Sequence, residues 1–350
     1  MTAFITVDEA LRFKNAIYID VRSPSEYKES TIVGAVNFPI LNDEERAEVG
    51  TVYRKENHQK AISLGVKYAS YKLPILYEQI LDYQNKYEQI IFFCWRGGMR
   101  SRSVCDFLSM FNIPKVYQLV GGYKGYRKYI MDYFENKLDF FHFIMIHGLT
   151  GVGKTHILED LSSEGMAVLN LEELAQNSGS VFGDIVFNGE PPSQKMFESK
   201  IFHKLFASME KNIFVESESK RIGNVQIPEK IYRKMISGNH ILINTSLDNR
   251  VKIILQDYID HIDENKEKIV KALEHLRKKL GNEAVDNLLQ KQSENAYTYI
   301  IKYLIEHYYD PLYQYSIDKY KEYDLEIYYE DIKTVAATLQ DFVKSLKQQR

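Results

Sequence analysis

The sequence predicts an α/β protein of two domains, the second of which ends in a long helical region. Three observations support this prediction. Short apolar segments alternate with helical patterns, the alternation starts again at Leu138, and beyond Leu247 the chain becomes charged, tyrosine-rich and helically periodic to Arg350. Its 350 residues suffice for two domains of ordinary size. The predicted domains are residues 1–135 and 136–350, with the boundary within residues 133–138.

Four segments of the first domain are short, apolar and rich in β-branched or aromatic residues, which is typical of strands. They are residues 16–21, 34–39, 89–94 and 114–122. Helices are predicted between them. One starts at a capping serine, Ser23, with Pro24 at the first helical position. The longer predicted helical segments are residues 42–70, 99–111 and 123–137.

The second domain begins with a predicted strand over residues 138–148, followed by a glycine-rich loop and a helix from Lys154. Two further strands are predicted over residues 165–171 and 212–217. After Leu247 only helices are predicted, because many charges combine there with a helical spacing of apolar residues.

Composition limits the possible classes of function. A formal net charge of −3 excludes a surface coated in positive charge, although it is compatible with a local basic face. The two cysteines, Cys94 and Cys105, are too few for a disulfide scaffold and favour a reducing compartment. The N-terminal residues lack the pattern of a signal peptide, and no segment has the ~20 apolar residues of a membrane helix. We therefore expect a cytoplasmic protein without a membrane partner.

Cys94 ends a predicted strand and opens the stretch CWRGGMRS, called here the cysteine loop (residues 94–101). Backbone N–H groups converge at a turn between a strand and a helix, and glycines let the backbone curl around one centre. Together with nearby arginines they favour a negatively charged sulfur, so Cys94 is the candidate nucleophile. A half-buried structural cysteine is the alternative. The candidate anion-binding residues are Arg96, Gly97, Gly98, Arg100 and Ser101.

Cys105 lies inside the helix that follows the cysteine loop. It shares the apolar pattern of its neighbours, so we predict a core residue. The alternative is a thiol that resolves an oxidised Cys94.

The stretch GLTGVGKT, called here the phosphate loop (residues 148–155), follows a strand and opens a helix. It fits the pattern G-x-x-x-x-G-K-[ST], in which backbone N–H groups surround phosphates. Lys154 would neutralise the phosphates, and Thr155 is a possible ligand of Mg²⁺. A chance match at the start of a helix is the alternative. The candidate phosphate-binding residues are Gly148, Gly151, Gly153, Lys154 and Thr155.

An acidic partner of the phosphate loop is expected at the end of a neighbouring strand. The stretch NIFVESES offers Glu216 and Glu218, either of which could orient Mg²⁺ or a water molecule. Acidic residues after strands are common, so the pattern does not choose between them.

Residues 3–133 resemble a rhodanese domain. The matching strings are IDVRSPSEY, IVGAVNFP, CWRGGMRS and LVGGYKGY. The resemblance implies a covalent intermediate on Cys94, of the persulfide type or equivalent, and a bracing role for Asp20 and Arg22. From Cys94 to Arg100 the loop is one residue longer than in the usual sulfurtransferase, as in the related dual-specificity phosphatases and arsenate reductases. A wider loop suits a tetrahedral, phosphate-like anion.

The chain as a whole resembles the tRNA 2-selenouridine synthase family. The supporting strings include CWRGGMRS, GLTGVGKT, PPSQKMFE, VESESKRIG, HLRKKLG and YYDPLYQYS. The resemblance implies the fold class: an N-terminal rhodanese-like domain, then a P-loop NTPase-like α/β domain with a helical C-terminal region. It also implies a transferase that exchanges sulfur for selenium in 2-thiouridine at the tRNA wobble position, through an S-geranylated intermediate. Selenophosphate and geranyl diphosphate are the implied co-substrates, with Cys94 serving selenium transfer and the phosphate loop binding diphosphate.

Binding of tRNA requires basic surface, and residues 264–280 are rich in lysine and arginine. A solvated helix face explains this richness equally well. A selenophosphate-producing enzyme is a further possible partner. The candidate tRNA contacts are Arg277, Lys278 and Lys279. Three tyrosines, Tyr308, Tyr309 and Tyr313, could shape a lipid or base pocket, or simply pack.

Two other functions are compatible with the two loops. The first is a cysteine-dependent phosphatase or sulfurtransferase fused to an ATP- or GTP-binding, kinase-like domain. The second is a non-catalytic sulfur-relay or tRNA-binding module, which would have little use for both an activated cysteine and a complete phosphate loop.

Overall fold

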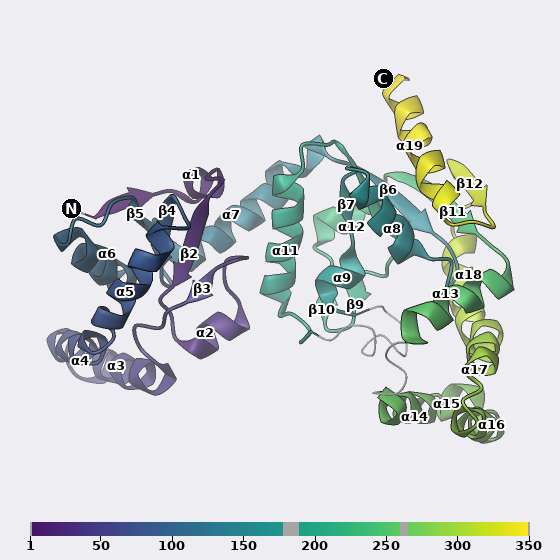
Figure 1. The fold of residues 1–350 in the computed structure, drawn as a ribbon, viewed down its shortest axis with the longest axis horizontal. Helices are drawn as coiled ribbons and strands as arrows, with labels where there is room; N and C mark the ends of the chain where they lie inside the picture. Colours follow the sequence, from purple (N-terminus) through teal and green to yellow (C-terminus); the bar gives the residue numbers. More distant parts are fainter. Residues whose placement is uncertain (1, 178–188, 260–264, 349–350) are drawn as a thin grey trace. The chain divides into compact units, whose positions relative to one another are not determined.

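The computed structural model describes residues 2–177, 189–259 and 265–348. The chain divides into two compact units, coloured from purple to yellow along the sequence in Figure 1. The first unit is Met1–Asn136 with Glu198–Lys200, and the second is Lys137–Phe197 with Ile201–Arg350. In the described part of the chain, no helix is long and apolar enough to cross a membrane.

The first unit is built on a five-stranded parallel sheet in the order β1-β5-β4-β2-β3. Four of its strands confirm predicted ones: β2 (Ala16–Asp20), β3 (Val36–Asn37), β4 (Gln89–Phe93) and β5 (Val116–Leu119). The edge strand β1 (Ala3–Ile5) was not predicted. It has only three residues, of which two are exposed, so it leaves no apolar pattern in the sequence.

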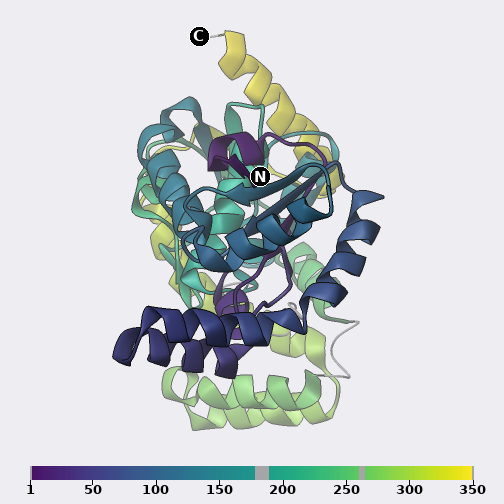
Figure 2. The same ribbon diagram turned by 90° about the vertical axis from the view of Figure 1, so that its left-hand side faces the viewer.

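The helices of the first unit follow the predicted pattern. Ser23 begins α2 through a capping box with Glu26, and Asn42 begins α3 through another with Glu45. Figure 2 shows α3 and α4 side by side as a helical hairpin. The helices are α1 (Val7–Leu11), α2 (Pro24–Glu29), α3 (Asp43–Lys55), α4 (His58–Ser70), α5 (Leu73–Gln84), α6 (Met99–Met110) and α7 (Gly122–Asn136).

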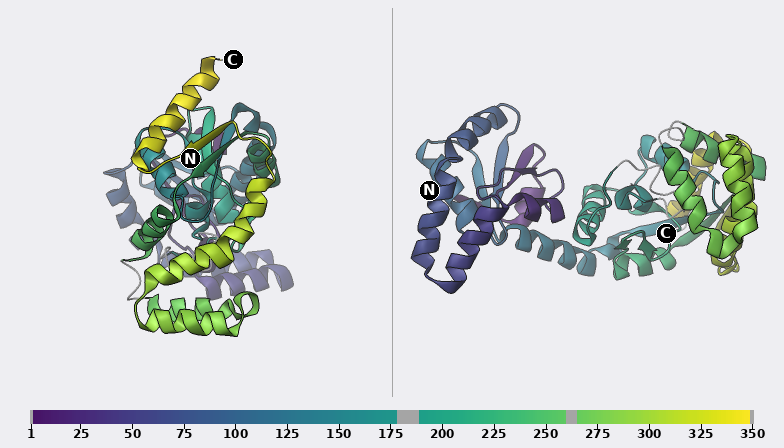
Figure 3. Two further views of the ribbon diagram at one scale, coloured as in Figure 1. Left: turned by 90° about the vertical axis from the view of Figure 1, so that its right-hand side faces the viewer. Right: turned by 90° about the horizontal axis from the view of Figure 1, so that it is seen from below.

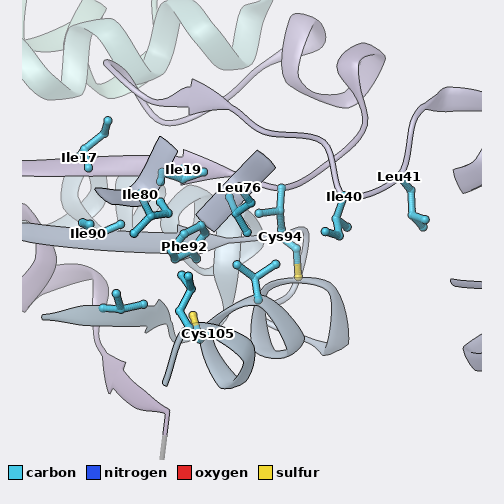
Figure 4. Close-up of a cluster of buried hydrophobic side chains, with 14 residues drawn as sticks. Ile17, Ile19, Ile40, Leu41, Leu76, Ile80, Ile90, Phe92, Cys94 and Cys105 are labelled. Carbon is cyan, nitrogen blue, oxygen red and sulfur yellow. The ribbon is translucent and has the colours of Figure 1, made fainter. Parts of the chain in front are cut away.

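The core of the first unit lies between β2, β4 and the helices that cover them. Figure 4 shows both cysteine side chains in this cluster, Cys94 at the end of β4 and Cys105 on α6. Cys105 is buried, and burial raises the pKa of its thiol. The prediction that Cys105 is a core residue is therefore confirmed.

The second unit also contains a five-stranded parallel sheet, in the order β12-β11-β6-β8-β7. Its predicted strands are confirmed as β6 (His142–His147), β7 (Val168–Leu169) and β8 (Asn212–Glu216), with a 3₁₀ turn (Leu138–Phe140) before β6. Strand β11 (Asn239–Asn244) and the small antiparallel pair β9 (Arg221–Ile222) and β10 (Val225–Gln226) were not predicted. The first helices of this unit are α8 (Lys154–Ser163), α9 (Leu171–Ala175), α11 (Gln194–Ala207), α12 (Glu229–Ile236) and α13 (Leu247–Ile259).

The prediction of helices alone after Leu247 is wrong at one place. Strand β12 (Leu325–Tyr328) pairs in parallel with β11 and completes the sheet. It is an edge strand in which half-buried or buried residues alternate with exposed ones, and four residues are too few for this alternation to stand out among helices.

The other C-terminal elements are helical. Helices α14, α16 and α17 bury their own apolar cluster, and the left view of Figure 3 shows the green helices α14 to α16 as a layer. The elements are α14 (Lys266–His275), α15 (Arg277–Leu280), α16 (Asn282–Ser293), α17 (Tyr297–Leu304), a π-helical turn (Ile305–Tyr309), α18 (Asp310–Asp318) and α19 (Lys333–Gln348).

Candidate active sites

The sulfur of Cys94 lies at the N-terminus of α6. Cys94 is only 3% exposed, and its Sγ accepts hydrogen bonds from the backbone N–H of Gly98 at 3.2 Å and the hydroxyl of Ser101 at 3.3 Å. Gly98 is the residue that caps the helix. The helix N-terminus and both donors favour an anion beside this sulfur, which is the role expected of the cysteine loop.

Glycines let the cysteine loop lie directly against the end of β5. Gly97 and Gly122 both have positive φ, and a Cβ on Gly122 would lie 2.2 Å from the carbonyl oxygen of Cys94. The N–H of Tyr123 donates to that carbonyl oxygen at 2.9 Å, and the N–H of Lys124 donates to the carbonyl of Trp95 at 2.9 Å. The strings CWRGGMRS and LVGGYKGY therefore form one packed unit.

Gln118 braces the cysteine loop and was not predicted to have a role. Its Nε2 donates to the carbonyl oxygen of Gly97 at 2.7 Å and to Oγ of Ser101 at 3.1 Å. Gln118 is buried in β5. The sequence did offer a signal for this role: a glutamine within an apolar strand is expected to be buried, and a buried amide needs hydrogen-bond partners.

The two arginines of the cysteine loop differ in their environments. Arg96 is exposed, whereas the guanidinium of Arg100 donates to the carboxylate of Glu26 at 2.7 and 3.4 Å. Burial alone would raise the pKa of Glu26, but the hydrogen bond and charge of Arg100 outweigh it and lower this pKa. Arg100 thus already has a carboxylate partner, while Arg96 faces solvent.

A buried ion pair lies below the loop, as the resemblance implied. Arg22 Nη2 lies 2.6 Å from a carboxylate oxygen of Asp20, and both side chains are almost fully buried. The guanidinium also lies 4.2 Å from the centre of the Tyr123 ring. These contacts join β2 to the start of α7.

The phosphate loop connects β6 to α8. Gly151 and Gly153 have positive φ, and a Cβ on either would collide with a neighbouring isoleucine side chain. Lys154 begins α8, and its Nζ donates to the carbonyl oxygen of Gly148 at 3.0 Å. The predicted strand–loop–helix context of this motif is confirmed.

Two side chains from distant parts of the chain hold the phosphate loop, and neither was predicted. Arg250 of α13 donates from Nε to the carbonyl oxygen of Thr150 at 2.8 Å, while its Nη1 lies 2.9 Å from Asp310. The hydroxyl of Tyr329, just after β12, donates to the carbonyl oxygen of Val152 at 3.0 Å. Isolated residues of these types carry no sequence signal.

The two predicted glutamates occupy different positions. Glu216 is 2% exposed, and its Oε1 accepts the backbone N–H of Glu172 at 2.8 Å. Burial raises the pKa of Glu216 to about 8. Glu218 lines a cavity, and burial raises its pKa to about 6, partly offset by the charge of Lys154.

Glu172 is a third carboxyl group at this place, and the sequence did not indicate it. Burial first, then the charges of Glu218 and Glu216, raise its pKa. Within residues 2–177, 189–259 and 265–348, no group of three or more His, Cys, Asp or Glu side chains is arranged to hold a metal ion. A Mg²⁺ ion at Thr155 therefore stays a prediction.

A cavity of about 670 Å³ lies at the carboxyl ends of β6 and β8, beside the phosphate loop. Lys154 Nζ is 6.0 Å from the centre of the Tyr313 ring, which lines the cavity. The structure thus brings the three predicted tyrosines together with Glu218. The tyrosines that line it are Tyr232, Tyr308, Tyr309, Tyr313, Tyr315 and Tyr320.

The predicted basic cluster is divided between paired and exposed residues. Arg277 donates to Glu274 at 2.5 and 3.0 Å and lies 2.7 Å from Asp286. Lys278 and Lys279 are exposed. The lysines are therefore better placed than Arg277 to reach an external phosphate.

Comparison with known proteins matches each part of the chain to a known domain family. Residues 141–345, more than half of the chain, match the tRNA 2-selenouridine synthase AAA domain, and residues 6–129 match the rhodanese-like domain. The predicted fold class is thereby confirmed.

Three curated relatives, each named tRNA 2-selenouridine synthase, are similar to the chain over most of its length. The protein of Hydrogenovibrio crunogenus is 31% identical, covering 89% of this chain and 92% of its own. That of Nitrosomonas europaea is 34% identical, covering 71% and 65%, and that of Sulfurovum sp. NBC37-1 is 29% identical, covering 87% and 90%. The chain belongs to the tRNA 2-selenouridine synthase family.

Proposed function

We propose that this protein converts 2-thiouridine at the wobble position of tRNA to 2-selenouridine through an S-geranylated intermediate. The observation that carries the proposal is that a member of this family has two loops of different chemistry, each at a helix N-terminus. The first holds a cysteine sulfur, and the second holds a lysine beside helix N–H groups that suit a phosphate.

The first reaction belongs to the phosphate loop. The sulfur of 2-thiouridine attacks the allylic carbon of geranyl diphosphate; a C–S bond forms, the C–O bond breaks, and diphosphate leaves with the electron pair while the base loses its N3 proton to water. Lys154 and the N–H groups of α8 stabilise the charge that develops on the diphosphate. This reaction needs a diphosphate site and no ATP.

A Mg²⁺ ion would suit the phosphate loop as a co-ligand of the diphosphate. Mg²⁺ commonly uses one or two protein oxygens together with substrate phosphates and water, so it does not require a cluster of three acidic side chains. The hydroxyl of Thr155 and the carboxylate of Glu218 would supply these oxygens. When bound, the ion would neutralise charge on the departing diphosphate.

The second reaction belongs to the cysteine loop. Selenophosphate, from a selenophosphate-producing enzyme, is a tetrahedral anion that the N–H groups of the loop and Arg96 would bind. Selenium replaces the geranylated sulfur on the base: the C–Se bond forms as the C–S bond breaks, and geranylthiol leaves. Water then cleaves the Se–P bond, which releases phosphate and leaves selenium on the base. Cys94, next to the N–H groups of the loop, would contact the selenium atom.

The test is mass spectrometry of tRNA nucleosides. We expect thiolated tRNA to gain a geranyl group with geranyl diphosphate, and selenium after selenophosphate is added. The Lys154→Ala variant should lose the first step but still selenate pre-geranylated tRNA, and Cys94→Ser should do the reverse. Absence of both mass shifts, or full geranylation by Lys154→Ala with lost selenation, would contradict the proposal. Hydrolysis of phosphomonoesters instead would favour a phosphatase.

A further inference from the structure

His147 is the last residue of β6, directly before the phosphate loop, and it lines the 670 Å³ cavity. Its Nε2 lies 2.9 Å from Nδ1 of His240 on the neighbouring strand β11. Nε2 of His240 in turn lies 3.0 Å from the carbonyl oxygen of Ile236. Among the described residues, this chain of contacts leaves Nδ1 of His147 as the one ring nitrogen without a partner.

The carbonyl oxygen of Ile236 determines where the protons lie along this series of contacts. A carbonyl oxygen only accepts, so Nε2 of His240 must carry a proton and donate to Ile236. In a neutral ring Nδ1 of His240 is then an acceptor, so Nε2 of His147 must donate to it. Nδ1 of His147 therefore has no proton and presents a lone pair.

Both rings stay neutral at neutral pH. Burial, with smaller contributions from the charges of His240 and Lys154, lowers the pKa of His147 to about 3. Burial also lowers the pKa of His240. Tyr320 packs against both rings, with its centre 4.8 Å from that of His147 and 4.2 Å from that of His240, and so restricts their orientation.

The rest of the cavity suits a nucleobase better than an aliphatic chain. Its walls combine flat tyrosine rings with Ser217, Glu218, Arg221 and Lys319. Single-stranded bases in RNA complexes are commonly stacked on aromatic rings and hydrogen-bonded at their edges. An aliphatic chain would instead remove these polar groups from water without replacing their hydrogen bonds.

We propose that this cavity takes the target pyrimidine and that Nδ1 of His147 accepts a hydrogen bond from the ring N3–H of 2-thiouridine. This assignment rests on the proposed function and names the residue that recognises the base. A cytosine ring presents a lone pair at N3, which would oppose the lone pair of Nδ1. His147 is thus a specificity-determining residue, and His240 is a positioning residue that fixes its tautomer.

The test compares two anticodon stem–loop RNAs that differ at the wobble base, one with 2-thiouridine and one with 2-thiocytidine. The full-length protein should bind the thiouridine RNA more tightly, on the order of tenfold by fluorescence anisotropy. His147→Phe should abolish this preference because it removes the acceptor. His240→Phe should also abolish the preference. Without His240, the ring of His147 can carry its proton on either nitrogen, so that Nδ1 can donate to one base or accept from the other.

The matched control is His142→Phe, at the other end of β6, where Nε2 lies 2.6 Å from Asn239 outside the cavity. It should keep the wild-type preference. If His147 has a purely structural role, His147→Phe would weaken binding of both RNAs equally and leave the ratio of the two affinities unchanged. That result would overturn the inference, as would equal binding of the two RNAs by the wild type. If the preference is present but thiolated tRNA is never modified, the proposed function fails and the recognition role stands.

Discussion

The hydroxyl of Ser101 donates a hydrogen bond to the sulfur of Cys94 across 3.3 Å, from the first turn of α6. Ser101 is fully buried, and its oxygen accepts the side-chain amide of Gln118 at 3.1 Å. Because the amide of Gln118 donates to that oxygen, the hydroxyl of Ser101 is left to donate its own hydrogen, either to the sulfur or to the carbonyl oxygen of Gly98 at 3.4 Å. The pair thereby links the sulfur of Cys94, which follows β4, to the neighbouring strand β5.

Replacing Ser101 by Ala should slow selenation of pre-geranylated tRNA by about tenfold, because the sulfur of Cys94 would lose one of its two hydrogen-bond donors. Geranylation should not change. Mass spectrometry of the nucleosides over time measures both rates. Ser103→Ala is the matched control, because Ser103 lies on the same helix, is exposed and donates only to the carbonyl of Arg100. Equal losses in the two variants would contradict a role for the hydroxyl.

Replacing Gly122 by Ala should destabilise the first unit by more than about 3 kcal/mol, because the new Cβ would overlap the carbonyl oxygen of Cys94. Gly34→Ala is the control. Gly34 also has positive φ, but no atom lies within 4 Å of the added Cβ, so only backbone strain of roughly 1–2 kcal/mol is expected. Urea unfolding of the full chain compares them. Similar losses would mean that the close approach to Cys94 is unimportant.

The buried carboxyl of Glu216 should make stability depend on pH. Its pKa is raised to about 8 in the folded protein, above the ordinary value of 4.5, so its contribution is complete below about pH 4.5 and is lost as pH rises through 8. Between about pH 6 and pH 9 the wild type should therefore lose more stability than Glu216→Gln, by up to a few kcal/mol. Gln still accepts the N–H of Glu172. Parallel urea-unfolding profiles for both proteins would disprove this.

Replacing Asp310 by Asn should destabilise the second unit by about 3 kcal/mol, because Arg250 is 5% exposed and would lose its charged partner. The phosphate loop should also bind inorganic diphosphate more weakly, since Arg250 holds the carbonyl of Thr150. Thermal unfolding and calorimetry measure the two effects. Asp318→Asn, an exposed residue of the same helix, should change neither. Unaltered diphosphate binding by Asp310→Asn would show that the loop does not depend on this brace.

Replacing both Lys278 and Lys279 by Ala should weaken tRNA binding at low salt. The steepness with which the logarithm of the association constant falls with the logarithm of salt concentration should decrease by roughly 1 to 2. The slope is measured by filter binding at several salt concentrations. Arg277→Ala should affect the slope less, because Arg277 is already paired with Glu274 and Asp286. An unchanged slope in the double variant would remove these lysines from the tRNA surface.

Local patterns predicted much of the fold and the strand–loop–helix context of both loops. Strand β4 with Cys94 after it, and the phosphate loop, are each contiguous in the sequence, so local patterns are enough to predict them. Gln118, Glu172 and the pair Arg250–Asp310 were missed because their roles come from partners far away in the chain. Strand β12 was missed for a related reason, since an edge strand of four residues is defined by the strand it pairs with.

The late position of β12 has a consequence for synthesis of the protein. The hydroxyl of Tyr329 supports the carbonyl of Val152, a residue made 177 positions earlier. Until β12 is made, β11 has an open edge and the phosphate loop lacks this support. A chain truncated before Leu325 would keep every residue of the phosphate-loop motif but would lack strand β12 and the hydroxyl of Tyr329, so the motif alone does not guarantee a complete sheet beneath the loop.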